Sequence, residues 1–144
     1  MLSRISFLGG ITEQQRSVIY RHLEAAHFNK GEYIARRGEE PSHIFIIRAG
    51  SVHLIIGNED INVTKRTFGA GDCFGEAALL SLINNTASFV AAEDSELVVF
   101  SRKAFNSLRK EDPDIFLKVI LNIARELARK LQFSDERLLR PDDT

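Results

Sequence analysis

The apolar positions of this chain follow a helical period at its two ends and a strand period in between. Near the N-terminus, Thr12 followed three residues later by Gln15 is typical of a capping box. The apolar stripe that follows, from Val18 to Ala26, predicts a helix that ends near His27.

The middle of the chain contains short strand-like runs separated by glycine-containing turns. Runs rich in apolar and β-branched residues, bounded by turn residues, are typical of strands. The predicted strands cover residues 33–35, 44–47, 51–56, 61–68, 88–92 and 97–100, with a hairpin turn at 57–60. Short strands at such close spacing favour a β-sandwich or a β-roll.

The helical period returns after the last strand. A short helix is predicted over 103–109, and a long one starts at Pro113, whose fixed backbone angle suits a first helical turn. The long helix is expected to end near Leu138. The sequence therefore predicts a single domain over 1–144, with an N-terminal helix, a β-core over about 27–101 and a helical segment over about 102–138.

The long helix carries two apolar faces. Phe116, Val119 and Ile123 form the face expected to lie on the β-core. The second face is spaced three and four residues apart like a heptad repeat, and consists of Leu117, Ile120, Ala124, Leu127, Leu131, Ser134 and Leu138. A second apolar face favours self-association into a homodimer, and the alternative is one broad stripe packed inside a monomer.

Composition narrows the class of protein without naming a function. The 144 residues are 44% apolar and 27% charged with a net charge of −1, which gives no electrostatic case for a nucleic-acid or membrane surface. No apolar run has the length of a membrane span.

The single cysteine, Cys73, forms no internal disulfide and indicates a reducing, cytoplasmic location. The four histidines are scattered and predict no metal site.

The stretch from Phe68 to Val90 is the best candidate for a binding site. It contains a glycine-rich turn, then Phe74-Gly75-Glu76, then a short apolar run over 77–80 that predicts one or two helical turns. Free N–H groups at the start of a helix attract anions, and Glu76 beside them suits a vicinal hydroxyl, so that a sugar phosphate would fit. The alternative is an ordinary glycine-rich connection between two strands.

Several of these segments together resemble one known family, the cyclic nucleotide-binding domains. The segments Gly31-Glu32-Tyr33-Ile34, Gly38-Glu39, 45–52, Gly71-Asp72-Cys73-Phe74-Gly75-Glu76 and Ala128-Arg129-Lys130-Leu131-Gln132 carry the similarity. The match is to the sensor half of bacterial catabolite-activator and FNR type regulators. It implies an α+β fold, namely a β-roll (a double-stranded β-helix, jelly-roll-like) flanked by an N-terminal helix and a long C-terminal helix.

The resemblance also implies a ligand, cyclic AMP (cAMP) or cyclic GMP (cGMP), and a binding site without a metal or another cofactor. The backbone of Gly75 would meet the phosphate and Glu76 the ribose 2′-hydroxyl, while Thr86 would donate to the phosphate and Ser134 would reach the base. The implied ligand-binding set is Phe74, Gly75, Glu76, Ala77, Asn85, Thr86, Ala87 and Ser134.

One residue departs from the family pattern. Ligand-binding members carry an arginine just before the small pair that Thr86-Ala87 matches, and this chain has Asn85 there. An amide lacks the permanent charge and the bidentate fork that arginine offers to a phosphate. The basic pairs Arg36-Arg37 and Lys65-Arg66 are expected on solvated strand faces, although one of them is a candidate replacement cation.

Three hypotheses for function follow. The first is a non-catalytic regulatory sensor that binds cAMP or cGMP and signals through its C-terminal dimerisation helix. The second is a protein-interaction module of the same fold that has lost nucleotide binding because of Asn85. The third is a transcription factor truncated before its DNA-binding part, because the chain supplies no recognition helix and is not expected to bind DNA alone. No residue pattern supports an enzyme.

Overall fold

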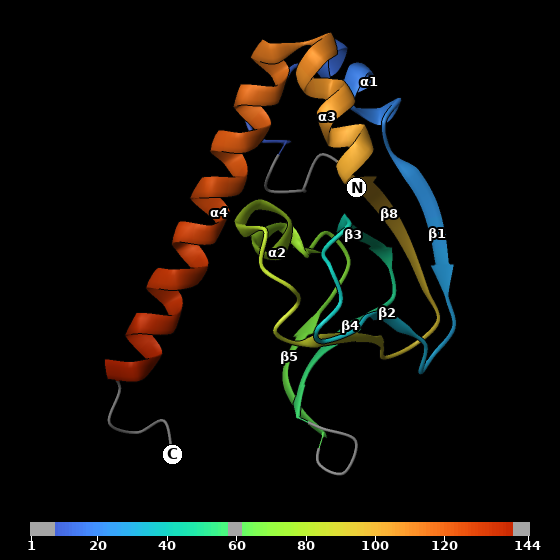
Figure 1. The fold of residues 1–144 in the computed structure, drawn as a ribbon, viewed down its shortest axis with the longest axis vertical. Helices are drawn as coiled ribbons and strands as arrows, with labels where there is room; N and C mark the ends of the chain where they lie inside the picture. The colour runs from blue at the N-terminus through green and yellow to red at the C-terminus, as the bar shows by residue number, and fades with distance from the viewer. Residues whose placement is uncertain (1–7, 58–61, 140–144) are drawn as a thin grey trace.

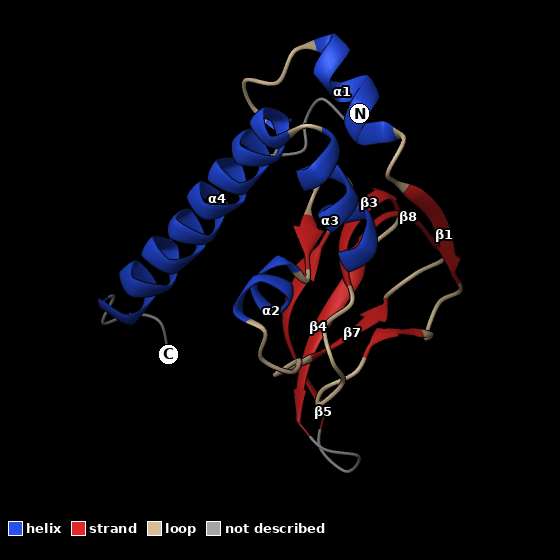
Figure 2. Cartoon of the chain, turned by 45° about the horizontal axis from the view of Figure 1, so that its top comes forward, coloured by secondary structure: helices blue, strands red, loops and turns tan. Residues whose placement is uncertain are grey.

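The computed structural model describes residues 8–57 and 62–139. The elements in chain order are α1 (Glu13–Tyr20), β1 (Glu24–Phe28), β2 (Tyr33–Ala35), β3 (His43–Ala49), β4 (Val52–Gly57), β5 (Asn62–Phe68), β6 (Cys73–Phe74), α2 (Glu76–Ser81), β7 (Ser88–Ala91), β8 (Ser95–Ser101), α3 (Arg102–Glu111) and α4 (Pro113–Leu139). Two antiparallel four-stranded sheets, ordered β1-β8-β3-β6 and β2-β7-β4-β5, form the predicted β-roll. The helices gather at one end and along one side of it (Figures 1 and 2).

The N-terminal helix begins as predicted and ends earlier than predicted. The Gln15 N–H donates to Thr12 Oγ1 at 3.2 Å and the Thr12 N–H donates to Gln15 Oε1 at 3.0 Å, which confirms the capping box. The helix stops at Tyr20 instead of near His27. Residues 24–28 form β1 instead, because they pair antiparallel along the edge of β8 and so satisfy backbone groups that would otherwise lack partners.

The remaining predicted elements are confirmed with small shifts of their bounds. The short strand β6 was not predicted, since its two residues are too few to show a period. It exists because Cys73 and Phe74 pair with Ile46 and Phe45 of β3. Most of the predicted hairpin turn between β4 and β5 lies outside the described residues.

The central strands β3 and β8 of the sheet β1-β8-β3-β6 are buried on both faces, which fixes where the helices lie. In β3, Ile44 and Ile46 pack with residues of α1, α3 and α4, whereas Phe45 and Ile47 point into the interior of the roll. The side chains of β8 alternate in the same way, with Val98 and Phe100 toward the helices and Leu97 and Val99 toward the interior of the roll. Successive side chains of a strand point to opposite faces. A continuous apolar run in β3 or β8 therefore packs both into the core under the helices and into the core inside the roll.

Helix α4 buries the face that the sequence assigned to the core, although the exposed face differs from the predicted one. Val119 and Ile123 are buried and Phe116 packs partly against the same core, as predicted. Ile120 and Leu127 were placed in the self-association seam, but both are half-buried and pack against this core. The exposed stripe consists of Leu117, Leu121, Ala124, Ala128 and Leu131.

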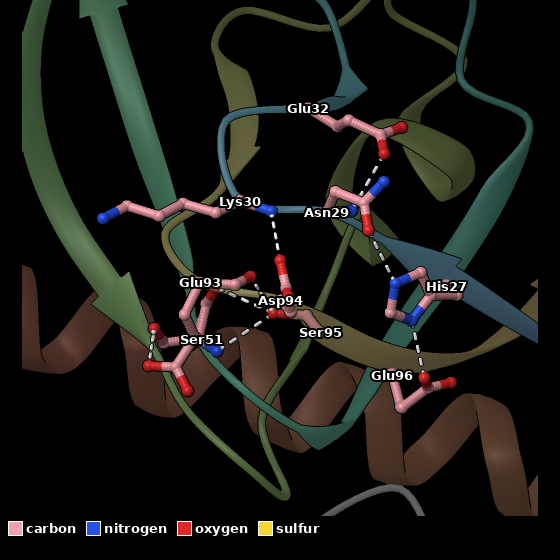
Figure 3. A network of polar contacts seen from close by, with 9 residues as sticks. All are labelled: His27, Asn29, Lys30, Glu32, Ser51, Glu93, Asp94, Ser95 and Glu96. Atoms are coloured by element: carbon pink, nitrogen blue, oxygen red, sulfur yellow. Dashed lines mark hydrogen bonds and ion pairs between the residues drawn. The ribbon is translucent and has the colours of Figure 1, made fainter.

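A polar network at one end of the roll includes His27, from the strand that the sequence did not predict (Figure 3). Its Nδ1 lies 2.6 Å from Glu96 Oε1, and its Nε2 lies 2.9 Å from Asn29 Oδ1. Because a protonated imidazole donates to both oxygens, the contact with Glu96 and then that with Asn29 raise the pKa of His27 above its ordinary value.

This contact predicts a pH-dependent stability. A histidine pKa that folding raises contributes stability below the unfolded value, and the contribution is lost as pH rises through the folded value. Glu96→Gln removes the carboxylate while keeping the size of the side chain. We expect the pKa of His27, measured by NMR titration, to fall in that variant. We also expect the variant's deficit in unfolding free energy to shrink as pH rises. An unchanged His27 pKa would contradict the assignment.

Candidate functional site

The candidate site is the segment 73–87, which comprises β6, α2 and the loop that leads into β7. Gly75, between β6 and α2, has a φ of +88°, a conformation that favours glycine. A Cβ at this position would lie 2.7 Å from the His43 carbonyl oxygen and 3.4 Å from the Phe45 ring. The close neighbour that requires a glycine is therefore strand β3 of the chain itself.

Glu76, the first residue of α2, is only 3% exposed. Its Oε1 accepts from the Lys130 Nζ of α4 at 2.5 Å, and the same ammonium lies 3.4 Å from the Cys73 carbonyl oxygen. Its second carboxylate oxygen, Oε2, is buried and has no hydrogen-bond partner. Buried polar atoms nearly always have partners, so an unpaired oxygen here marks a place for a hydrogen-bond donor.

Asn85 connects the site to the turn after β2. Its Nδ2 donates to the Arg36 carbonyl oxygen at 3.3 Å. Its backbone makes two further bonds, accepting from the Gly38 N–H at 2.7 Å and donating to the Glu39 carbonyl oxygen at 2.9 Å. Asn85 therefore holds this turn against the site, and its amide nitrogen is already used by the chain.

A cavity of about 330 Å³ opens between this turn, β3 and the 73–87 segment. It is lined by Ala26, Phe28, Ile34, Ala35, Glu39, Glu40, Pro41, Ser42, His43, Phe45, Gly75, Asn85, Phe89 and Val99. The lining combines an apolar wall with a polar rim that carries two carboxylates, and no lysine or arginine among the described side chains is part of it. An anion bound here would meet like charge without a compensating cation.

The structure brings some of the predicted site residues together and separates others. Gly75 and Asn85 line the same cavity, whereas Glu76 is absent from its lining and faces α4 instead. The other predicted residues divide into core and surface: Phe74 and Ala87 are buried, and Ala77 and Thr86 are exposed. Ser134 lies on α4, but its side chain is outside the described part.

Phe74 has a clear structural role. Its ring stacks between Phe45 and Phe89, with ring centroids 5.0 and 4.5 Å away, and Phe68 lies 5.7 Å away. Together these rings fill the interior of the roll beside the cavity. Phe74 therefore fixes the position of the glycine and the glutamate that follow it.

The basic side chains proposed as replacement cations have other neighbours. The Arg36 guanidinium lies over the Tyr33 ring at 4.0 Å, and that of Arg66 lies over the Phe68 ring at 4.7 Å. Neither lines the cavity. The side chain of Lys65 is not among those described.

Lys130 is the site residue that the sequence reasoning missed. It lies seven positions after the buried Ile123, so helical periodicity places it on the inner face of α4. A cation at such a position, on a helix face that is mostly apolar, is the signal that would have predicted a buried acidic partner.

The chain therefore folds as a β-roll closed by helices, with a glycine and a buried glutamate between β6 and β7. The model of the cyclic nucleotide-binding domain matches residues 25–112, which is more than half of the chain. The chain belongs to the cyclic nucleotide-binding domain family. Human cGMP-dependent protein kinase 2 is 34% identical over 108 residues, which cover 73% of this chain. The chain spans only 7% to 29% of the length of the curated relatives that it matches.

Solved structures agree with this assignment. The Thermus thermophilus catabolite activator protein superposes with a TM-score of 0.80 at 26% identity, covering 92% of this chain and 61% of that one. A second match is the regulatory subunit of a cAMP-independent protein kinase A from Trypanosoma brucei (TM-score 0.74, 28% identity, 87% and 44% covered). That structure is of a triple mutant bound to cAMP, and one of its substitutions introduces an arginine in place of a threonine.

Two further observations on the described residues concern membrane-spanning helices and metal sites. Across residues 8–57 and 62–139, no helix has the length and hydropathy needed to cross a membrane. Among the same residues, no group of histidine, cysteine and acidic side chains is arranged to hold a metal ion.

Proposed function

We propose that this chain is a non-catalytic regulatory module that binds one cAMP or cGMP at the 73–87 segment and transmits the binding to α4. The observation that carries the proposal is Glu76, whose buried Oε2 lacks a partner at the position that the family uses for a ribose hydroxyl. A hydroxyl donor would satisfy that oxygen. The name of the human relative, a cGMP-dependent kinase, supports a cyclic nucleotide as the ligand class.

A second candidate function is a protein-interaction module that binds no nucleotide. It is favoured by the cavity lining, whose described side chains offer two carboxylates and no cation. It is also favoured by Asn85, whose amide nitrogen donates to the Arg36 carbonyl oxygen. The Trypanosoma brucei neighbour supports the same reasoning. It is a cAMP-independent kinase subunit, and the form bound to cAMP carries an introduced arginine.

We also propose that the chain forms a homodimer through α4. Leu117, Leu121 and Leu131 are 57%, 45% and 64% exposed. Together with Ala124 and Ala128 they are spaced four, three, four and three residues apart along one face, which is the spacing of a coiled-coil seam. A self-complementary stripe of this kind fits a second copy of the same helix, which would bury the exposed leucines.

Titration calorimetry with cAMP and with cGMP tests the binding proposal. Wild type should bind one nucleotide per chain, and Glu76→Gln should weaken binding about tenfold or more, because an amide replaces the charged acceptor of the hydroxyl. Glu13→Gln, an exposed change on α1, is the matched control and should bind as wild type does. Equal affinity of Glu76→Gln and wild type would place the ligand elsewhere, and no binding by wild type would favour the interaction module.

A further inference from the structure

We infer that Lys130 is a positioning residue that makes ligand binding and the docking of α4 depend on each other. It holds Glu76 through one carboxylate oxygen and leaves the other oxygen for a hydroxyl of the ligand. This inference rests on the proposed function, in which Glu76 accepts from the ribose.

The first support is the geometry of the Lys130–Glu76 pair. The two side chains are 23% and 4% exposed, so the pair is largely removed from water. The Lys130 ammonium also contacts the Cys73 carbonyl oxygen, and it lies 5.9 Å from the centroid of the Phe68 ring. Removing one member of such a pair leaves a buried charge without compensation. The orientation of the Glu76 carboxylate therefore depends on Lys130.

The second support is the position of Lys130 along α4. The buried contacts of this helix, Ile115, Val119 and Ile123, all lie in its first half. Beyond them, among the side chains that the structure describes, Leu127 packs partly against the core and Lys130 makes the polar contacts with the roll. Among the described side chains, the second half of α4 is thus attached to the roll chiefly through one leucine and one lysine.

The third support is the arrangement of the elements. Helix α2, which begins with Glu76, lies between α4 and the strands in both views (Figures 1 and 2). A ligand hydroxyl on Oε2 and the ammonium on Oε1 would share one carboxylate. Coupling between two sites is reciprocal, so a ligand that fixes Glu76 favours docked α4, and docked α4 favours the ligand by the same factor.

The test compares cAMP with 2′-deoxy-cAMP, which lacks the hydroxyl, by calorimetry on wild type, Lys130→Met and Lys130→Arg. Wild type should prefer cAMP over the deoxy compound by about tenfold, the approximate value of one hydrogen bond to a charged group. Lys130→Met should bind cAMP about tenfold more weakly and lose this preference. Lys130→Arg should keep most of the affinity for cAMP and most of the preference for cAMP over the deoxy compound. Arg129→Met, an exposed change at the next position of α4, should behave as wild type.

A purely structural ion pair would give a different result. Lys130→Met would then lower the affinity for cAMP and for 2′-deoxy-cAMP by the same factor and keep the preference for cAMP. That result, or unchanged cAMP affinity in Lys130→Met, would overturn the inference. Circular dichroism melting of each variant shows whether it is folded. If the methionine variant is not, wild type still provides a test, because equal affinity for cAMP and the deoxy compound would overturn the inference.

Hydrogen exchange of α4 separates failure of this inference from failure of the proposed function. In the free chain, amides of α2 and of residues 124–132 should exchange faster in Lys130→Met than in wild type, because the attachment is lost. Added cAMP should slow the same amides in wild type only. If wild type binds neither cAMP nor cGMP, the proposed function fails and the link to the ligand fails with it. Equal exchange of the two free chains would additionally overturn the attachment of α4 to α2.

Discussion

Replacing Asn85 by arginine is expected to raise the affinity of the chain for cAMP and cGMP by about ten- to a hundredfold. The described side chains that line the cavity beside Asn85 include two carboxylates and no cation, so a guanidinium would supply a positive charge for the phosphate. The substitution removes the bond from Asn85 Nδ2 to the Arg36 carbonyl oxygen, which is a modest loss because the two backbone bonds of residue 85 remain. Calorimetry and thermal melting of both proteins measure the two effects.

The neighbouring residue provides the control. Asn84 is exposed and does not line the cavity, so Asn84→Arg adds the same charge one position away and should leave affinity nearly unchanged. Tight binding of a cyclic nucleotide by wild type would show that Asn85 does not lower the affinity. If neither wild type nor Asn85→Arg binds a nucleotide and both melt alike, the sensor hypothesis is wrong and the interaction module remains.

Leu131→Glu is expected to convert a dimeric chain into a monomer. Leu131 is 64% exposed in the single chain and lies on the proposed seam, where dimerisation would bury the new carboxylate against its copy. Two buried like charges should weaken association by more than tenfold, whereas stability of the monomer should change little, because the leucine contributes little to the core. Analytical ultracentrifugation at tens of micromolar measures the state of each protein.

Two comparisons make the dimer test specific. Asn106→Glu adds the same charge on the exposed side of α3 and should leave the dimer intact. Leu127→Glu should instead lower the melting temperature, because Leu127 packs against the core of its own chain. A monomeric wild type, or a Leu131→Glu protein that stays dimeric, would contradict the proposed seam.

The fold was predictable from the sequence wherever local chemistry decides it. The capping box at Thr12 and Gln15 and the long α4 both appear as predicted. Strand β1 was missed because its residues continue a helical stripe, and only the distant edge of β8 makes them a strand. Pairing between segments some seventy residues apart leaves no local signal in either segment.

The sequence identified candidate site residues, but it did not show the contacts that these residues make. The residues Gly75, Glu76 and Asn85 were identified by their resemblance to a family. The structure places Gly75 between β6 and α2, Glu76 at the start of α2, and Asn85 in the loop that follows α2. Spacing alone could not show that the cavity lacks a cation. Nor could it show that Glu76 pairs with Lys130, since this contact depends on how α4 lies across α2.

The most direct test of the account is an NMR titration of the ¹⁵N-labelled chain with cAMP and with cGMP. If the 73–87 segment binds the nucleotide and α4 responds, the largest amide shifts should fall at residues 74–77 and 84–87, with a second group around Lys130 on α4. The Glu76→Gln protein should show much smaller shifts at the same concentrations. An unchanged spectrum with either nucleotide, or shifts confined to other parts of the chain, would contradict the account.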